Sequence, residues 1–302
     1  MRKIIPLLVL CSLFFSCSTL SKSQTESVHQ FGEVTENFSA YPSAIMNELA
    51  EIRMKRGLFY ASTLTDPMRQ LNELDSIHSQ RKYDYKVSES IDVTFRVIDK
   101  YAQSLILLSS EDYNDNLQSH AATMGLDIDS LITLYNTTDN SRSLPTGIGD
   151  ALGNIIGYGG DRYIRGKQAE KIKDFVIKAD TLIAVMTSNL LEYLESSNLQ
   201  ELISYEENMI RRNYLSYLQL TKASTFESQR DYLRLKQNID AAKELRAQTI
   251  QATTDLKEAH NELVKVIQKK QKLYRTIQEL QVFYLQVTNL RRTLKALNEE
   301  QN

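Results

Sequence analysis

The sequence predicts an all-α protein, an elongated helical bundle that ends in one long coiled-coil-like C-terminal helix or an antiparallel helix pair. Three observations support this fold class. Only 10 Gly and 4 Pro occur among 302 residues, whereas Leu, Ala, Glu, Lys and Gln abound, as is typical of helical proteins. No Gly or Pro follows Gly166, so nothing forces a break there. Apolar residues also recur at steps of three and four.

The first part of the body, residues 41–140, is expected to contain several helices. Pro42 and Pro67 each suit the first turn of a helix. The chain from residue 112 to 135 is expected to form two short helices around Gly125. One further stretch has the three- and four-residue steps of an amphipathic helix: Ile91, Phe95, Ile98, Ala102 and Leu105.

A glycine-rich segment, residues 146–166, follows and contains seven of the ten glycines. Gly149, Gly153 and Gly157 recur every four residues, so on a helix they would line one face and let another backbone approach closely. This spacing resembles the glycine zippers of several bacterial envelope proteins. Two interpretations are open: a helix packed tightly against the bundle, or a membrane-touching or oligomerising hairpin within residues 147–166. The segment is too short for a stable transmembrane span.

Residues 167–302 are expected to form the long helices. From Leu235 to Leu294 the core positions alternate steps of three and four without a slip, which predicts a heptad seam with left-handed supercoiling. The last of these positions are Leu273, Ile277, Leu280, Tyr284, Val287, Arg291 and Leu294. An unbroken helix over 225–298 would be about 110 Å long. The chain therefore either turns back near Gln268–Lys272 or forms a rod. The seam is the core of the protein's own bundle or a contact with a second copy or a partner.

No group of residues points to catalysis, a metal or a cofactor. Four histidines are scattered along the chain, at His29, His78, His120 and His260. None has a second ligand at the spacing of a metal site, and His260 is expected on a solvated flank of the seam. No nucleophile motif occurs. The sequence predicts a protein that is not an enzyme, and a lipoprotein enzyme of unknown chemistry remains an alternative hypothesis.

The N-terminus has the pattern of a signal peptide. Arg2 and Lys3 are basic, and residues 4–15 form an apolar run that is too short to span a membrane. The residues Phe14-Phe15-Ser16-Cys17 resemble the lipobox of bacterial lipoproteins, in which a small residue precedes the modified cysteine. The resemblance implies that 1–16 are removed and that lipid, including palmitate, is attached at Cys17. Cleavage after Ser18 by ordinary signal peptidase is the alternative.

The same resemblance implies a location in the cell envelope. Because Ser18 is not the Asp that retains lipoproteins at the inner membrane, we expect an outer-membrane protein. No acidic cluster follows Cys17, which favours a periplasm-facing body. Residues 17–40 are polar and are expected to form a tether. The mature chain has no cysteine besides Cys17 and thus no disulfide.

The expected function is that of a membrane-anchored structural or protein-binding scaffold. The membrane would be reached through the N-terminal lipid, and a protein partner or a second copy through the helices. A membrane-active protein that uses residues 147–166 is the alternative. Loss of Arg2 and Lys3 would leave 34 basic against 38 acidic side chains, so no basic excess suggests nucleic acid.

Overall fold

Every regular element that the structure describes is a helix, which confirms the all-α class. The computed structural model describes residues 20–41, 44–111, 115–138, 143–152, 161–222, 224–269 and 272–301. The elements in these ranges are α2 (Lys22–Ser39), α3 (Ala44–Ala61), α4 (Pro67–Ser109), α5 (Asp115–Thr138), the short 3-10 helix η2 (Gly149–Leu152), α6 (Asp161–Glu195), α7 (Ser197–Thr221), α8 (Phe226–Ile267) and α9 (Leu273–Gln301).

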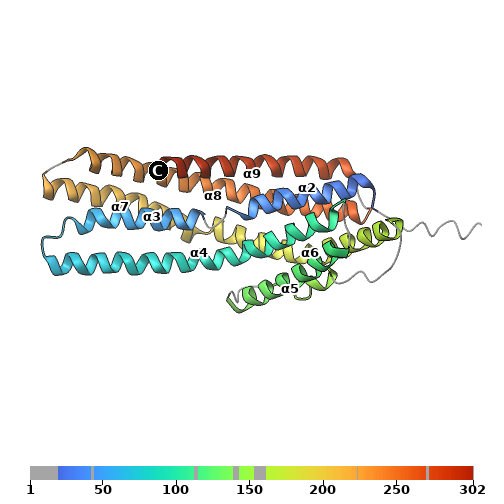
Figure 1. The fold of residues 1–302 in the computed structure, drawn as a ribbon. Coiled ribbons are helices and arrows are strands. Elements are labelled where there is room, and N and C mark those ends of the chain that lie inside the picture. Colours follow the sequence, from blue (N-terminus) through green and yellow to red (C-terminus); the bar gives the residue numbers. More distant parts are fainter. Residues whose placement is uncertain are drawn as a thin grey trace, which may run out of the picture.

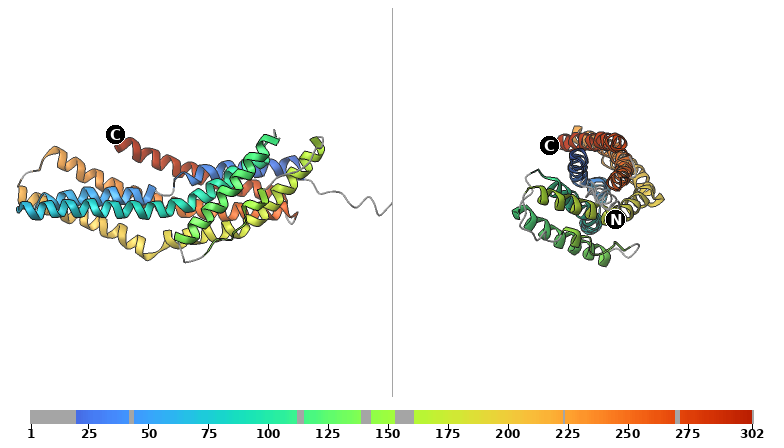
Figure 2. Two further views of the ribbon diagram at one scale, coloured as in Figure 1. Left: turned by 60° about the horizontal axis from the view of Figure 1, so that its bottom comes forward. Right: turned by 90° about the vertical axis from the view of Figure 1, so that its right-hand side faces the viewer.

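The helices run along a rod with two distinct ends (Figure 1). α2 and α3 follow one another from the end where α2 begins, which we call the proximal end, to the opposite, distal end, and α4 returns. α6 with α7, and then α8, repeat this path. With 43 residues, α4 alone is about 65 Å long at about 1.5 Å per residue. α9 packs on α8 and α2, and α5 packs on α4 (Figure 2). The predicted elongated bundle is therefore confirmed.

Polar caps explain where the helices begin. Pro67 opens α4 as predicted, and the Asp66 side chain accepts a hydrogen bond from the Arg69 amide at 2.9 Å. Thr225 caps α8 in the same way through the Ser228 amide. Ser196 separates α6 from α7 and caps the second. Such caps satisfy backbone amides that lack a partner within the helix.

The long C-terminal segment folds as an antiparallel helix pair, since the chain turns back between Ile267 and Leu273 as the sequence allowed. Lys269 adopts a φ of 60° in this connection. In α8 every predicted seam position from Leu235 to Val266 is buried. The predicted phase of α9 is wrong in part, because Ile277 and Tyr284 are exposed. The buried face of α9 consists instead of Thr276, Leu280, Phe283, Val287, Leu290 and Leu297.

The predicted polar tether over residues 17–40 is wrong from Lys22 to Ser39, because these residues form α2 and contribute to the core. Val28, Phe31 and Phe38 have no exposed surface. A capping box between Ser21 and Gln24 begins the helix. Buried residues 28, 31, 35 and 38 follow helical spacing, which the surrounding polar residues obscured. The folded body therefore starts close to Cys17.

Candidate functional site

Most of the site residues that the sequence predicts lie outside the residues that the structure describes. Cys17, Gly153 and Gly157 lie outside the described residues. Gly149 begins η2 rather than standing within an α-helix, and it packs on Gly125 of α5. A Cβ at Gly125 would lie 2.5 Å from the carbonyl oxygen of Gly149. Close backbone approach thus explains both glycines, and Gly125 lies inside one continuous helix instead of between two short ones.

Substitution of Gly125 by alanine is expected to lower the unfolding free energy by about 1–3 kcal/mol, the usual cost of overpacking. The new methyl group would meet backbone atoms of Gly149, which cannot yield as a flexible side chain would. Gly166→Ala is the matched control. No atom lies within 4 Å of a Cβ added there, and Gly→Ala within a helix gains up to about 1 kcal/mol. Urea denaturation of both variants checks this, and equal effects would contradict it.

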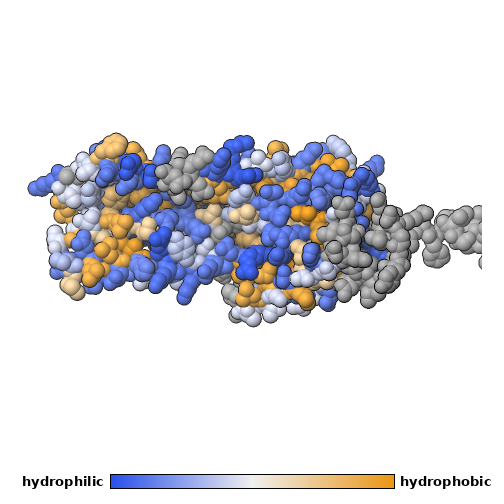
Figure 3. Space-filling view, in the orientation of Figure 1, coloured by the Kyte–Doolittle hydropathy of each residue, from blue (hydrophilic) through white to orange (hydrophobic). Residues whose placement is uncertain are grey.

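Exposed apolar side chains gather at the distal end, where α3 connects to α4 and α7 to α8. This end carries nine of the twenty large apolar side chains that are exposed in the described part of the chain. Each stands within eight residues of a helix end, and Figure 3 shows apolar surface gathered there (left). We call them the distal patch: Leu58, Tyr60, Met68, Leu71, Leu74, Leu215, Leu220, Phe226 and Leu233. Apolar side chains that gather at one place on the surface mark interaction sites.

The distal patch borders a pocket, and the residues around it have a net positive charge. A pocket of about 360 Å³ lies between α3, α7 and the start of α8, with Phe59, Tyr217 and Leu235 in its wall. Residues 55–76 and 211–234 together contain eight basic and five acidic side chains. The chain as a whole has a net charge of −2. The distal end therefore combines apolar and net basic character.

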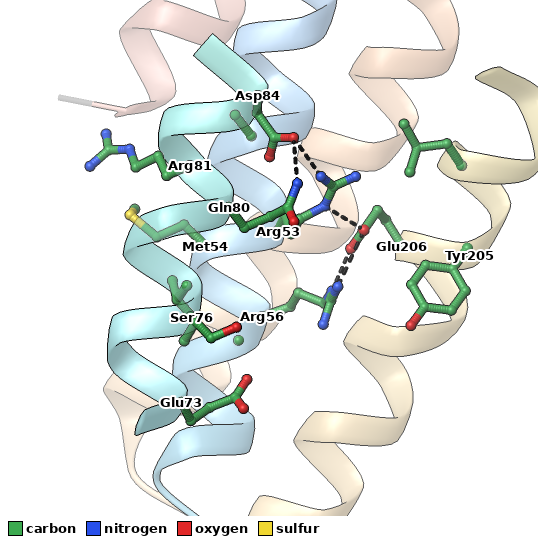
Figure 4. Close-up of a pocket in the computed structure, with 14 residues that line it drawn as sticks. Arg53, Met54, Arg56, Glu73, Ser76, Gln80, Arg81, Asp84, Tyr205 and Glu206 are labelled. Atoms are coloured by element: carbon green, nitrogen blue, oxygen red, sulfur yellow. Dashed lines mark hydrogen bonds and ion pairs between the residues drawn. The ribbon is translucent and has the colours of Figure 1, made fainter. Parts of the chain in front are cut away.

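A buried cluster of charged side chains ties three helices together near the distal end (Figure 4). Glu206 of α7 is fully buried. Its carboxylate accepts hydrogen bonds from Arg53 Nε at 3.0 Å and from Arg56 Nε, both of α3. Arg53 Nη1 also donates to Asp84 Oδ1 of α4 at 2.6 Å. Gln80 Nε2 donates to the same oxygen at 3.1 Å.

The cluster lines a pocket of about 320 Å³ between α3, α4 and α7. Both Glu206 oxygens are engaged by arginine, so this carboxylate is held as an ion-pair partner and cannot approach a substrate. Asp84 Oδ2 is buried without a hydrogen-bond partner among the described residues. The arrangement fixes the register of the three helices, and we assign it a structural role.

A second buried polar group joins α4, α6 and α8. His260 is 1 % exposed, so the expected solvated position is wrong. Its Nε2 lies 2.8 Å from the Tyr101 hydroxyl, and its Nδ1 lies 3.5 Å from Asp180 Oδ1. The histidine ring also packs on Phe31, with ring centroids 5.6 Å apart. A proton on Nδ1 would face Asp180 and leave Nε2 to accept from Tyr101.

Burial shifts the acid–base equilibria of this group. It lowers the pKa of His260, and the contact with Asp180 offsets part of that effect. Burial raises the pKa of Tyr101 well above its usual value. The contact with His260 lowers the pKa of Asp180. With a neutral histidine and a fully buried tyrosine hydroxyl, the group resembles a core network more than an accessible reaction centre.

Stability is expected to fall with acidification below about pH 6.5, the pKa of His260 in the unfolded chain. The unfolded chain takes up a proton there while the folded chain resists it. The loss is at most about 1.4 kcal/mol per pH unit and ends at the lowered folded pKa. The expected contribution is fully present above about pH 6.5. Urea denaturation over this range checks it: His260→Gln removes this part of the pH dependence, whereas the exposed His78→Gln retains it.

The described residues contain no group of three or more His, Cys, Asp or Glu side chains placed to hold a metal ion. No helix among them has the length and apolar character needed to cross a membrane.

Sequence reasoning missed the Glu206 cluster, although one signal was present. Glu206 stands between Ile203 and Ile210 at helical spacing, so a charged residue occupies the buried face of α7. Such a position predicts a buried partner. Its partners, Arg53 and Arg56, lie about 150 residues away on α3, and no local pattern links them to it.

Comparisons with protein-family models, curated proteins and solved structures find no match to this chain.

Proposed function

We propose that the protein is a lipid-anchored outer-membrane lipoprotein that faces the periplasm and serves as a scaffold, binding a partner protein through its distal end. The lipobox-like residues that end at Cys17 support the anchor. The start of the folded body at Leu20 leaves two residues, Ser18 and Thr19, between the anchor and the rod. The rod then carries the distal patch away from the membrane.

The distal patch is the observation that carries the partner-binding part of this proposal. Met68 is 65 % exposed and Phe226 is 78 % exposed, and both stand in the first turn of their helices. Large apolar side chains in such positions gain free energy when a partner removes them from water. The basic excess around the patch fits a partner whose binding surface is apolar with an acidic rim.

Site-specific photocrosslinking in intact cells tests this proposal. A photoreactive amino acid replaces Phe226 or Met68 in separate variants, and Tyr284 or Leu285 on α9 serves as the control position. All four side chains are more than half exposed. We expect one protein adduct of defined mass from the two distal positions and none from the controls. The adduct should weaken when Arg211 and Arg230 are replaced by glutamate.

Two outcomes would contradict the proposal. Equal adducts from distal and control positions would indicate non-specific contact along the rod. Crosslinking of Phe226 to lipid instead of protein would favour a membrane-active protein, the alternative that concerns residues 147–166, of which 153–160 lie outside the described residues.

A further inference from the structure

We infer that the proximal end of the rod rests on anionic lipid headgroups, and that the described basic side chains at the end of α8 and the start of α9 supply the main contact. This inference rests on the proposed lipid anchor and goes beyond it. An acyl anchor alone lets a rod pivot about its attachment, whereas a second, electrostatic contact with the same membrane would hold the rod at a defined angle.

The chain enters the folded rod at Leu20, and this entry point places the membrane near the proximal end. Leu20 packs against the hydrophobic core, and α2 begins two residues later. Leu20 is three positions after Cys17, so their Cα atoms lie at most about 11 Å apart even when the chain is fully extended. Acyl chains on Cys17 therefore bring the membrane surface close to the first turn of α2.

The end of α8 lies beside this first turn (Figure 1). Gln24 Nε2 of α2 donates a hydrogen bond to the Val266 carbonyl oxygen near the end of α8, at 3.1 Å. The start of α6 belongs to the same end of the rod, because Gln168 Nε2 donates to the Leu108 and Ser110 carbonyl oxygens where α4 ends. Both segments would thus face the membrane that holds Cys17.

These two segments are strongly basic. Residues 262–279 contain five basic and two acidic side chains, and residues 161–173 also contain five basic and two acidic. Lys265 pairs with Glu262 at 2.7 Å. Three acidic residues within 108–115 oppose them only in part, and the whole chain has a net charge of −2. Four of the basic side chains lie exposed at the connection: Lys265, Lys269, Lys272 and Arg275. Clusters of this kind are attracted to anionic lipid surfaces.

Tyr274 adds an apolar contact within the basic cluster. Its side chain is 69 % exposed, and Ile277 is exposed one turn further along α9. Tyrosine is favoured at the level of lipid headgroups because its ring is amphipathic. A protein partner could also use basic and aromatic side chains, but Cys17 is three residues from this end, so the lipid surface is the nearest occupant. We therefore commit to anionic lipid.

A fluorescence experiment on the full-length lipidated protein tests the inference. The protein is reconstituted into vesicles of phosphatidylcholine alone or of phosphatidylcholine mixed with phosphatidylglycerol. An environment-sensitive dye is attached to Gln278→Cys near the proximal end or to Gln219→Cys near the distal end; both positions are exposed. We expect the dye at residue 278 to show a blue shift in the mixed vesicles alone, reversed by high salt, and the dye at residue 219 to show none.

Charge-matched variants identify the contact. Glutamine substitutions at Lys265, Lys269, Lys272 and Arg275 should abolish the shift, since each basic residue at such a surface changes the affinity roughly fivefold. The control carries glutamine at four exposed basic positions of the distal end and should keep the shift: Arg211, Arg212, Lys222 and Arg230.

The outcomes separate this inference from the proposed anchor, because the intact mass of the same preparation reports acylation of Cys17. Suppose that the protein is acylated. If the dye at residue 278 shows the same emission in both kinds of vesicle, or if the proximal variant keeps the blue shift, the inference is overturned. The proposed anchor stands in either case. If the protein is not acylated, the anchor fails. Sedimentation of that protein with mixed vesicles then decides the inference: binding lost in the proximal variant supports it, and no binding overturns it.

Discussion

Replacement of Glu206 by alanine is expected to lower the unfolding free energy by about 3–5 kcal/mol, because it leaves buried arginine charge without a partner. Arg56 makes its described ion pair with Glu206 alone, and Arg53 would keep Asp84 only. The side chains of both arginines are less than one-fifth exposed, so water replaces the lost carboxylate only in part. Urea denaturation followed by far-ultraviolet circular dichroism measures the change.

Glu207→Ala is the control for this prediction. Glu207 neighbours Glu206 in the chain but is about one-third exposed and pairs with Lys236 and Lys243 of α8. Exposed pairs of this kind contribute up to about 1 kcal/mol. The combined variant Glu206→Leu with Arg56→Met should recover most of the loss, since apolar replacement of a buried ion pair is often neutral. Equal effects of Glu206→Ala and Glu207→Ala would show that the buried cluster does not stabilise the rod.

Replacement of Phe31 by alanine is expected to cost about 3–5 kcal/mol of unfolding free energy, as for other fully buried phenylalanines. Its ring lies 5.6 Å from that of His260 and 6.4 Å from that of Phe283, measured between centroids. The substitution would open a cavity between α2, α8 and α9. Thermal and urea denaturation would both report the loss.

Phe226→Ala provides the control, because the same atoms are removed from a side chain that is 78 % exposed. A change within about 0.5 kcal/mol is expected there. If Phe31→Ala were equally mild, α2 would behave as the polar tether that the sequence suggested, and Cys17 would be separated from the rod by a flexible segment.

Some of the architecture could be predicted because its signal is local and long. In α8 the apolar spacing persists over a whole helix, so the phase of the buried face was correct from Leu235 to Val266. In α9 the predicted phase of the buried face is wrong in part, because the break between α8 and α9 changes the rotation of the second helix about its axis. Phe283 and Leu290, which are buried, mark the correct face. The heptad pattern places Tyr284 and Arg291 at core positions, but both are exposed.

Other features could not be predicted because they depend on contacts between distant residues. Glu206 meets Arg53 across 153 positions of the chain, and His260 meets Tyr101 across 159. Glu206 taken alone indicates a charge on the buried face of α7, but it does not identify the arginines that meet it. The distal patch is similar: Met68 and Phe226 gather at one end only because two separate helix connections lie there.

Lipid attachment at Cys17 is the central claim, and mass spectrometry of the protein isolated from cell envelopes after labelling with palmitate tests it most directly. We predict label in the wild type and an N-terminal peptide that begins with acylated Cys17. Cys17→Ala should abolish the label, and Cys11→Ala should retain it. An unlabelled wild-type protein whose chain begins at Thr19, after cleavage behind Ser18, would contradict the claim.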